Sequence, residues 1–242
     1  MIGILKSTLK LHPEDYTSIV FFTGAGMSAE SGVPTYRGKG GIWHKYRWEE
    51  YACQEAFDRN PKKVLKFHEK RRKVLFDCQP HAGHHVIADI EKRHPQVTVV
   101  TQNIDGMHQR AGSEKVIELH GSAWRLRCTG CSVVTQDFNK SYKSYTCECG
   151  SWLRPDIIWF GDMLNENVIT RATKIIGNCD LFISIGTSGA VWPAAGFPQL
   201  AKSNEALCLE INPELSEMSY LYDELIRGKA GDILPELFEK IE

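Results

Sequence analysis

Five short apolar runs, with helical stretches between them, constrain the fold of this chain more than any other feature. Each run is too short for a helix and almost wholly apolar, which is typical of strands buried on both faces of a parallel sheet. The runs are Ile19 to Thr23, Val97 to Thr101, Val116 to Leu119, Leu181 to Gly186 and Ala206 to Ile211. Their alternation with helices predicts an α/β fold with a doubly wound parallel sheet.

Two helices between and after these strands can be placed from their apolar spacing. One carries apolar residues three or four apart from Val168 to Ile176 and stops at Gly177-Asn178. The other closes the chain, with Asp232 as its expected N-cap. Its apolar face consists of Leu234, Leu237, Phe238 and Ile241.

Two stretches break the strand–helix alternation. Gly38 to Pro80 is helical and charged, and Ser122 to Pro155 is polar and contains clustered cysteines. Both follow strand ends, so we expect them to form a second, smaller lobe over a cleft at the carboxyl ends of the strands. The expected single domain, 1–242, has a large lobe from about 1–37, 81–121 and 156–242 and a small lobe from 38–80 and 122–155.

Half of the eight cysteines form two close pairs with metal-ligand spacing. Cys128-Thr-Gly-Cys131 is followed, fifteen residues later, by Cys147-Glu-Cys149, a spacing close to that of a zinc ribbon. Because all four ligand positions are cysteine, no position is left for a catalytic water, and the sequence predicts one structural zinc. Four unrelated buried cysteines are the disfavoured alternative. We interpret the other cysteines as small, reduced core residues: Cys53, Cys78, Cys179 and Cys208.

Composition excludes several kinds of partner. The net charge is −1, so there is no overall electrostatic case for direct nucleic-acid binding or for an anionic membrane. No apolar run is long enough to span a bilayer, and the N-terminus lacks the features of a signal peptide. We therefore expect a cytoplasmic protein with no membrane partner.

The first strand leads directly into a glycine-rich turn, Gly24-Ala25-Gly26-Met27-Ser28-Ala29. The turn fits the G-x-G-x-x-A form of a dinucleotide-binding site, although this signal is weak alone and the usual acidic residue after the second strand is missing. Pro34 then disfavours continuation of the helix that such a turn opens. The loop that follows, Thr35 to Trp43, has the glycines and aromatic residues of a segment that closes over a ligand.

Together these motifs resemble those of sirtuins, the NAD-dependent protein lysine deacylases. The resemblance covers essentially the whole chain and rests on motifs that occur in the order of that family. They are GAGMSAESGVPTYRG, TQNIDGMHQRAG, ELHG, the four-cysteine ribbon, IIWFGDML, GTS and EIN. It implies a single catalytic domain with a Rossmann-like NAD-binding large lobe and a small lobe made of a helical insertion and a zinc ribbon.

The resemblance also implies the reaction, in which NAD is a consumed co-substrate. The amide oxygen of an acyl-lysine attacks the ribose anomeric carbon and nicotinamide leaves. His120, as general base, deprotonates a ribose hydroxyl that attacks the resulting imidate, and the products are free lysine and O-acyl-ADP-ribose. A histidine suits this role because its ordinary pKa lies near neutrality.

The implied site residues follow the same motifs. The catalytic set is His120, Asn103 and Asp105. Tyr36 takes the place of a usual Phe that shields the reacting carbon, and Arg37 supports the loop and phosphates. The implied NAD contacts are Gly24, Ala25, Gly26, Ser28, Tyr36, Arg37, Trp43, Gln102, Asn103, Ile104, Asp105, Gly186, Thr187, Ser188, Asn212, Pro213, Glu214 and Ala230.

Acyl-lysine proteins are the implied partners, bound by backbone pairing with a strand at Ile158 to Gly161. Ile158, Phe160 and Gly161 are its implied contact residues. Asp162 stands where Glu is common, which leaves one substrate contact open.

The acyl group that is removed depends on a helix predicted over Pro61 to Phe76 with an Asn60 cap. Its expected apolar stripe contains Val64, Phe67, Val74 and Leu75, with Arg71 in the middle and His68 at the edge. Sirtuins that remove succinyl or malonyl groups have a Tyr and an Arg three residues apart on the matching helix. His68 and Arg71 have this spacing, so we expect removal of succinyl and malonyl as well as acetyl groups. The succinyl preference is expected to fall as the pH rises through the titration of His68.

Several alternatives remain at this stage. Arg71 could be structural, paired with Asp58 or Asp77, which would leave a plain deacetylase. The same site could carry out NAD hydrolysis or ADP-ribosyl transfer. A non-catalytic NAD sensor or zinc-ribbon binding module would not need the base His120.

Overall fold

The centre of the molecule is a six-stranded parallel sheet. The computed structural model describes residues 9–36 and 40–238. The strand order β3-β2-β1-β7-β8-β9 is that of a Rossmann-like, doubly wound sheet, with its topological switch point between β1 and β7. The bounds are β1 Ile19–Thr23, β2 Val97–Thr101, β3 Val116–Glu118, β7 Leu181–Ile185, β8 Leu207–Ile211 and β9 Glu224–Ile226.

The five predicted strands are confirmed to within one residue at each end. The edge strand β9 was not predicted, because it has three residues of which two are exposed. Successive side chains of β1 point to opposite faces of the sheet, and both faces are buried, which explains why the runs are continuously apolar. Ile19 and Phe21 belong to one core, and Val20 and Phe22 to the core on the opposite face of the sheet.

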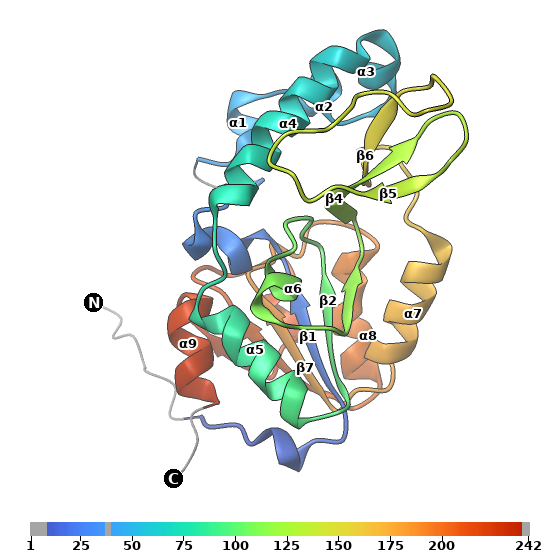
Figure 1. Ribbon diagram of the computed structural model, residues 1–242. Helices are drawn as coiled ribbons and strands as arrows, with labels where there is room; N and C mark the ends of the chain where they lie inside the picture. The colour runs from blue at the N-terminus through green and yellow to red at the C-terminus, as the bar shows by residue number, and fades with distance from the viewer. Residues whose placement is uncertain (1–8, 37–39, 239–242) are drawn as a thin grey trace.

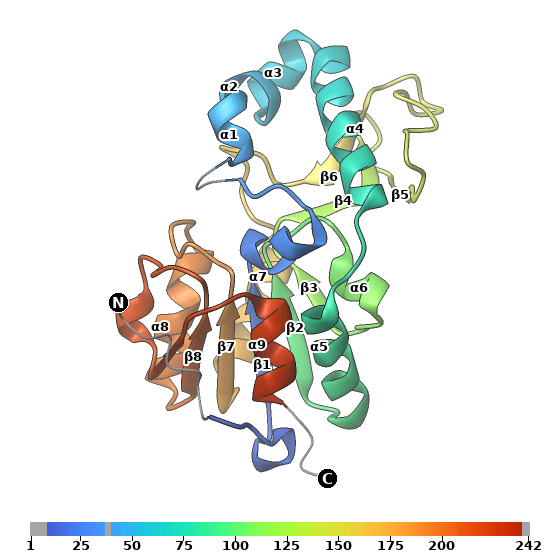
Figure 2. The ribbon, with the colours of Figure 1, turned by 90° about the vertical axis from the view of Figure 1, so that its left-hand side faces the viewer.

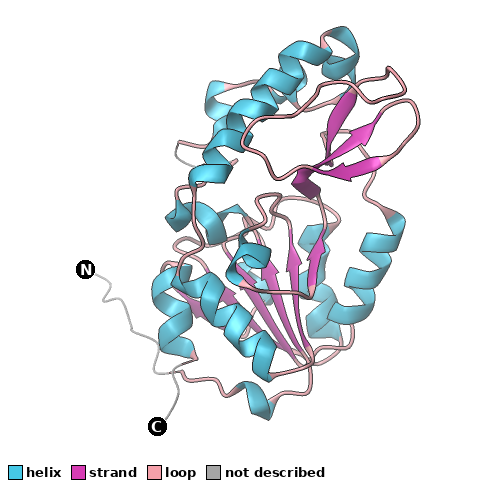
Figure 3. Cartoon of the chain, viewed as in Figure 1, coloured by secondary structure: helices cyan, strands magenta, loops and turns pink. Residues whose placement is uncertain are grey.

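Helices cover both faces of this sheet (Figures 1 and 3). α5 Ala82–Arg93 and α9 Ala230–Leu237 pack on one face. α7 Glu166–Ile176 and α8 Phe197–Ser203 pack on the other. The remaining elements of the large lobe are short: α6 Met107–Ala111, η1 Pro13–Asp15, η2 Ala25–Ser31, η3 Ala194–Gly196 and η4 Ser219–Leu221.

The end of the chain differs from the prediction in one detail. Lys229, not Asp232, is the N-cap of α9, and Asp232 lies in the first helical turn, where its negative charge is still favourable. Ile241 lies outside the described residues.

A small lobe stands at the carboxyl ends of the central strands (Figures 1 and 2). It combines four helices with a three-stranded antiparallel sheet of order β5-β4-β6, and the two parts share a core that includes Val64 and Trp124. The helices are α1 Ile42–Lys45, α2 Trp48–Tyr51, α3 Gln54–Arg59 and α4 Pro61–Asp77; the strands are β4 Gly121–Cys128, β5 Val134–Gln136 and β6 Leu153–Ile157.

Helix α4 confirms its predicted start but corrects its predicted face. The Asn60 side chain accepts a hydrogen bond from the Lys63 amide at 3.0 Å. Val74, expected in the apolar stripe, is 41% exposed, whereas Arg72 is only 1% exposed. The prediction that Arg71 lies in the middle of the buried face is therefore wrong, and Arg72 is the buried arginine.

The remaining cysteines are reduced, as expected. Cys53, Cys179 and Cys208 are buried, but Cys78 is only partly buried at the end of α4. Within residues 9–36 and 40–238, no helix combines the length and apolar character that a membrane span requires.

Candidate active site and metal centre

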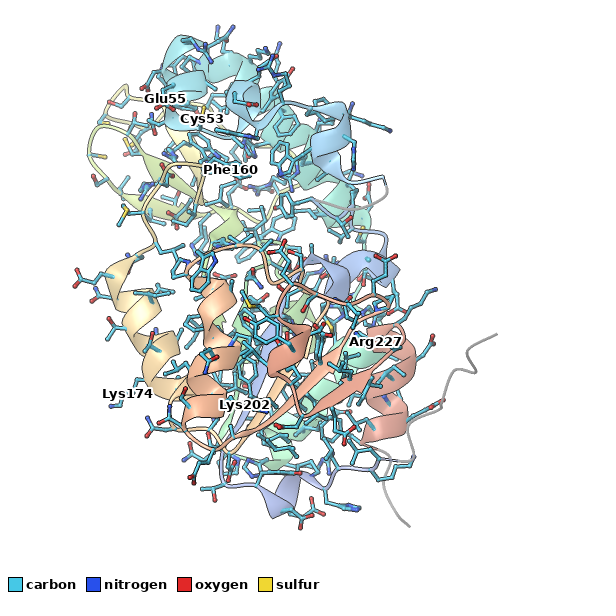
Figure 4. The ribbon with its side chains drawn as sticks, turned by 180° about the vertical axis from the view of Figure 1, so that it is seen from behind. Cys53, Glu55, Phe160, Lys174, Lys202 and Arg227 are labelled. Carbon is cyan, nitrogen blue, oxygen red and sulfur yellow. The ribbon has the colours of Figure 1, made fainter. Side chains whose placement is uncertain are left out.

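A cleft of about 720 Å³ lies between the small lobe and the carboxyl ends of β1, β2, β7 and β8. Phe160, one of its lining residues, lies in Figure 4 between Cys53 of the small lobe and the large lobe. Most of the expected site residues line the cleft: Gly24, Ala25, Gly26, Tyr36, Trp43, His68, Arg71, Gln102, Asn103, Ile104, His120, Ile158, Phe160, Gly186, Thr187, Ser188, Asn212, Pro213, Glu214 and Ala230.

Three expected residues do not line it in the described part of the chain: Ser28, Asp105 and Gly161. Asp105 is buried beneath the cleft, where its Oδ1 accepts a hydrogen bond from the Met107 amide at 2.9 Å. Burial raises the pKa of Asp105. Arg37 lies outside the described residues.

The glycine-rich turn is shaped by close packing between β1 and β7. A Cβ on Gly24 would lie 2.8 Å from the Gly186 carbonyl oxygen, and a Cβ on Gly26 would lie 2.7 Å from the Gly186 Cα. The Gly26 amide donates to the Gly186 carbonyl at 2.8 Å. These glycines are therefore required by the approach of the two strand ends, in addition to any ligand.

The helix that follows this turn is short for a local reason. Residues 25–31 form a 3₁₀ helix, η2, which ends at Gly32 in the left-handed conformation with a φ of 86°. Gly32 and the following Pro34 turn the chain away from the sheet and into the loop that leads to Tyr36.

His120 is held in one defined tautomer. Its Nδ1 lies 2.9 Å from the Gln102 carbonyl oxygen. Because a carbonyl only accepts, Nδ1 carries the proton, and Nε2 keeps its lone pair. Burial lowers the pKa of His120, so the ring is neutral near pH 7 and can take up a proton.

Asn103 links the exits of β1 and β2. Its Nδ2 donates to the Gly24 carbonyl at 2.9 Å and lies 3.3 Å from the Ser28 hydroxyl oxygen. The backbone amide of Asn103 donates to the Thr101 hydroxyl at 3.0 Å. The side chain is therefore buried, oriented and in contact with the glycine-rich turn.

The far end of the cleft joins the exits of β7 and β8. Asn212 Nδ2 donates to the Thr187 carbonyl at 3.0 Å. Arg227, which the sequence analysis missed, donates from one nitrogen to the Glu210 carboxylate and to the carbonyls of Asn212 and Glu214. No sequence pattern marks it, because its partners lie 13 to 17 residues away on another element.

Aromatic rings and one cation line the small-lobe side of the cleft. Trp43 lies with its ring centroid 6.0 Å from that of Tyr36 and 5.7 Å from that of Phe160. The Arg71 guanidinium carbon lies 4.8 Å from the Tyr36 ring centroid. Among the described residues Arg71 has neither a hydrogen-bond nor an ion-pair partner, so neither Asp58 nor Asp77 pairs with it.

His68 does not have the chemistry that the sequence suggested. It is 5% exposed, its Nε2 lies 2.9 Å from the Tyr51 carbonyl oxygen, and its ring stacks on Trp159. Burial, with a contribution from Arg71, lowers its pKa to about 3. The expected titration of His68 near neutral pH is therefore wrong, and its only proton is donated to Tyr51.

The segment Ile158 to Gly161 is a turn rather than the expected strand, since β6 ends at Ile157. Its first three amides are used within the chain: Ile158 donates to the His120 carbonyl at 3.0 Å and Phe160 to the Ala52 carbonyl at 2.9 Å, and Trp159 donates to Asp162. The Asp162 carboxylate accepts from Arg154 at 2.8 Å and from the Trp159 amide at 3.1 Å. Asp162 therefore stabilises this turn.

Val191 also lines the cleft and was not predicted from the sequence.

The four clustered cysteines fit a tetrahedral metal site. Their sulfur atoms lie within 4.8 Å of one another, with Cys128 and Cys149 at 3.4 Å and Cys131 and Cys147 at 3.7 Å. Zinc–sulfur bonds of about 2.3 Å place tetrahedral sulfurs about 3.8 Å apart. The amides of Gly130 and Cys131 point at the Cys128 sulfur, which favours its thiolate form.

Comparison with known proteins identifies relatives over nearly the whole chain. The model of the Sir2 family matches residues 24–193. NAD-dependent protein deacylase 2 of Pyrobaculum aerophilum is 45% identical over 225 residues, which are 92% of this chain and 90% of the relative.

Solved structures show the same similarity. A Sir2 homologue–NAD complex has a TM-score of 0.86 and 38% identity, covering 96% of this chain and 94% of the other. A complex of Sir2 with a p53 peptide and NAD+ has a TM-score of 0.81 and 26% identity, covering 93% of each chain.

Proposed function

This chain belongs to the Sir2 family, and we propose that it is an NAD-dependent protein deacylase that removes acyl groups from lysine side chains. The observation that carries this proposal is the state of His120. It is a neutral histidine whose Nε2 has no hydrogen-bond partner among the described residues, and it lines the same cleft as the glycine-rich turn and Asn103. A sensor that only binds NAD has no need of such a base.

NAD, when bound, supplies the activated ribose carbon that accepts the acyl oxygen. The residues of this chain bind and orient the NAD, remove a proton and exclude water. Asn103 and the turn at Gly24 position the ribose, and His120 Nε2 removes the proton from a ribose hydroxyl. Tyr36 and Trp43 exclude water from the reacting end, while Asn212 and the loop held by Arg227 receive the adenosine end.

We propose that residues 1–242 act as one catalytic domain, in which the four cysteines hold a structural zinc. The four thiolates leave no open ligand position, so the metal takes no part in the chemistry. Its role is to fix the antiparallel sheet that carries one wall of the cleft.

In this proposal the acyl-lysine peptide lies along the turn Ile158 to Gly161, and Val191 lines the same cleft. Because the amides of Ile158, Trp159 and Phe160 are used within the chain, the peptide backbone pairs with carbonyl oxygens of this segment and is recognised with little regard to sequence.

We further propose that acidic acyl groups, succinyl and malonyl, are substrates besides acetyl. The support is Arg71, a guanidinium that lines the cleft without a carboxylate partner. An unpaired cation in an apolar wall is unfavourable until a ligand anion pairs with it. His68 contributes packing and not charge.

Nicotinamide release tests the activity. The protein is incubated with NAD and an acetyl-lysine or succinyl-lysine peptide, and with NAD alone. Release that requires a peptide supports the deacylase, and release without peptide means NAD hydrolysis instead. Transfer of labelled ADP-ribose to protein would favour the ADP-ribosyltransferase.

The Arg71→Met variant tests the acyl preference. We expect desuccinylation to fall about tenfold or more, because a hydrogen bond to a charged group is lost, while deacetylation falls much less. Lys66→Met, an exposed change on the same helix, is the control. Equal losses for both substrates would identify Arg71 as structural and the protein as a plain deacetylase.

A further inference from the structure

A second cavity lies behind the acyl end of the cleft. Its volume is about 10 Å³, and it shares His68, Arg71, Ile104 and Ile157 with the cleft. A space of this size holds about one water molecule. A single carboxylate oxygen has a similar size, whereas the methyl end of a longer neutral chain is larger and apolar.

The donors around this cavity can be assigned one by one. Arg72 is occupied, because it pairs with Asp137 at 3.0 Å and donates to the carbonyls of Asn139 and Ala123. His68 gives its only proton to Tyr51. Two donors therefore remain among the residues that line the cavity: the Arg71 guanidinium and the Tyr142 hydroxyl.

Tyr142 reaches the cavity from the loop between β5 and β6. Helix α4 holds this loop through Glu69, which accepts from the Tyr142 amide at 3.0 Å and from the Tyr145 hydroxyl at 3.2 Å. The Tyr142 ring lies 4.9 Å from the Arg72 guanidinium carbon. The Arg72 guanidinium donates towards the Tyr142 hydroxyl oxygen, but the hydroxyl proton has no acceptor within the described residues. Burial raises the pKa of Tyr142, so the hydroxyl remains protonated and can donate.

We propose that Tyr142 is a specificity-determining residue of the acyl site. One oxygen of a terminal succinyl carboxylate enters the small cavity and accepts the Tyr142 proton, while the other oxygen pairs with Arg71. Tyr142 thus takes over the donor role that His68 cannot fill. This inference rests on the proposed removal of acidic acyl groups.

An acetyl group carries no terminal carboxylate to place in the cavity. An apolar chain of succinyl length would leave both the Arg71 and Tyr142 donors without an acceptor, and the carboxamide analogue offers one acceptor oxygen where the carboxylate offers two, so in either case a donor stays unpaired in a buried site. The geometry therefore favours a terminal carboxylate over both kinds of neutral chain.

The test compares Tyr142→Phe with Tyr145→Phe on three peptides, which carry acetyl-lysine, succinyl-lysine or the carboxamide analogue of succinyl-lysine. Tyr142→Phe keeps the ring and removes only the hydroxyl. We expect its kcat/KM for the succinyl peptide to fall about tenfold to a hundredfold, mainly through KM, and far more than for the acetyl peptide. Its preference for succinyl over the carboxamide analogue also shrinks.

Tyr145→Phe removes a hydroxyl from the same loop without touching the cavity, so the ratio of succinyl to acetyl activity stays at the wild-type value. Equal losses on all peptides in Tyr142→Phe, or the same ratio change in Tyr145→Phe, would reduce Tyr142 to a structural residue. If Arg71→Met loses desuccinylation selectively and Tyr142→Phe does not, this inference fails while the acidic preference stands. A wild-type protein that removes only acetyl groups overturns both.

Discussion

The protonation state of His120 decides the pH range in which the proposed reaction runs. Burial holds its pKa below the ordinary value of 6.5, and the Gln102 carbonyl fixes the proton on Nδ1. The base form is therefore present at neutral pH and is lost as the pH falls through the lowered pKa. We expect kcat/KM to show an acid limb with its midpoint below pH 6.5.

Replacement of His120 tests this role directly. His120→Ala should lower deacylation about 10²–10⁴-fold while NAD still protects the fold from thermal unfolding. His85→Ala is a matched control, since His85 is exposed on α5. Near-normal turnover in His120→Ala, or an acid limb that survives in it, would exclude His120 as the general base.

Of two adjacent arginines, Arg72 is expected to stabilise the fold, whereas Arg71 is expected to determine the acyl preference. Arg72 is buried against Asp137, so removing its charge leaves a buried carboxylate without its cationic partner, held only by hydrogen bonds from Asn139 and the Lys143 amide. We expect Arg72→Met to lower the free energy of unfolding by about 3–5 kcal/mol, measured by urea unfolding. Arg71→Met is the comparison, because Arg71 has no such partner and its loss changes stability little. A stability loss of the same size in both variants would contradict this division.

These two arginines also show which features of α4 could be predicted from the sequence and which could not. The ends and the Asn60 cap of α4 follow from local pattern and were predicted. Which arginine is buried depends on acceptors on distant segments, such as the Asn139 carbonyl 67 residues away. Tyr142 was missed for the same reason, because it lies in a polar loop whose position is set by contacts with α4.

The zinc ribbon and α4 form one structural unit of the small lobe. Glu69 and Arg72 bind the loop 137–145 from one side, and the cysteine site closes the ribbon at its far end. Loss of the metal should therefore disturb the wall of the small second cavity that carries Ala123 and Tyr142, although no cysteine lines the cleft within the described residues.

Cys131→Ser tests this connection. We expect one zinc per chain in the parent protein, weaker zinc retention in the variant, and loss of deacylation through disorder of the small lobe. Zinc content by elemental analysis and thermal melting are the measurements. Cys53→Ser, a change in the same lobe outside the metal site, should keep its zinc. Parent protein free of zinc, or a variant that melts like the parent, would contradict the ribbon assignment.

The parallel sheet explains why so much of the site could be predicted from the sequence. Residues directly after β1, β2, β7 and β8 necessarily meet at one edge, so Gly24, Asn103, Thr187 and Asn212 line one cleft. The turn at Phe160 and the contacts of Arg227 could not be predicted, because they depend on how separate elements pack. The sheet order places the cleft, and side-chain packing between the lobes determines its shape.

Across the whole molecule, three buried neutral histidines make folding sensitive to mild acid. His68 lies in the small lobe, and His84 and His108 lie together beside the sheet with ring centroids 5.0 Å apart. Burial lowers their pKa values to about 3, about 2 and about 3. In the unfolded chain the same side chains titrate at about 6.5.

The unfolded state therefore takes up protons that the folded state cannot take up. Stability is unaffected by these groups above pH 7 and falls as the pH drops from 6.5 towards 3. Three histidines give a slope of about 4 kcal/mol per pH unit once the unfolded imidazoles are protonated, near pH 5. Against a typical total of about 5–15 kcal/mol, we expect unfolding at a pH well above the titration of most carboxylates. Asp105, whose pKa is raised by burial, acts in the opposite direction, because at this group the folded state binds a proton more readily than the unfolded state.

Urea unfolding at pH 7.5, 6.5, 5.5 and 5.0 measures this slope. His108→Gln removes one of the three groups and should reduce the slope by about 1.4 kcal/mol per pH unit, whatever it does to stability at pH 7.5. His85→Gln, on the exposed side of α5, should leave the slope as it is in the parent. A free energy of unfolding that stays constant between pH 6.5 and 5.0 would mean that these histidines become charged in the folded protein, and their burial in neutral form would be wrong.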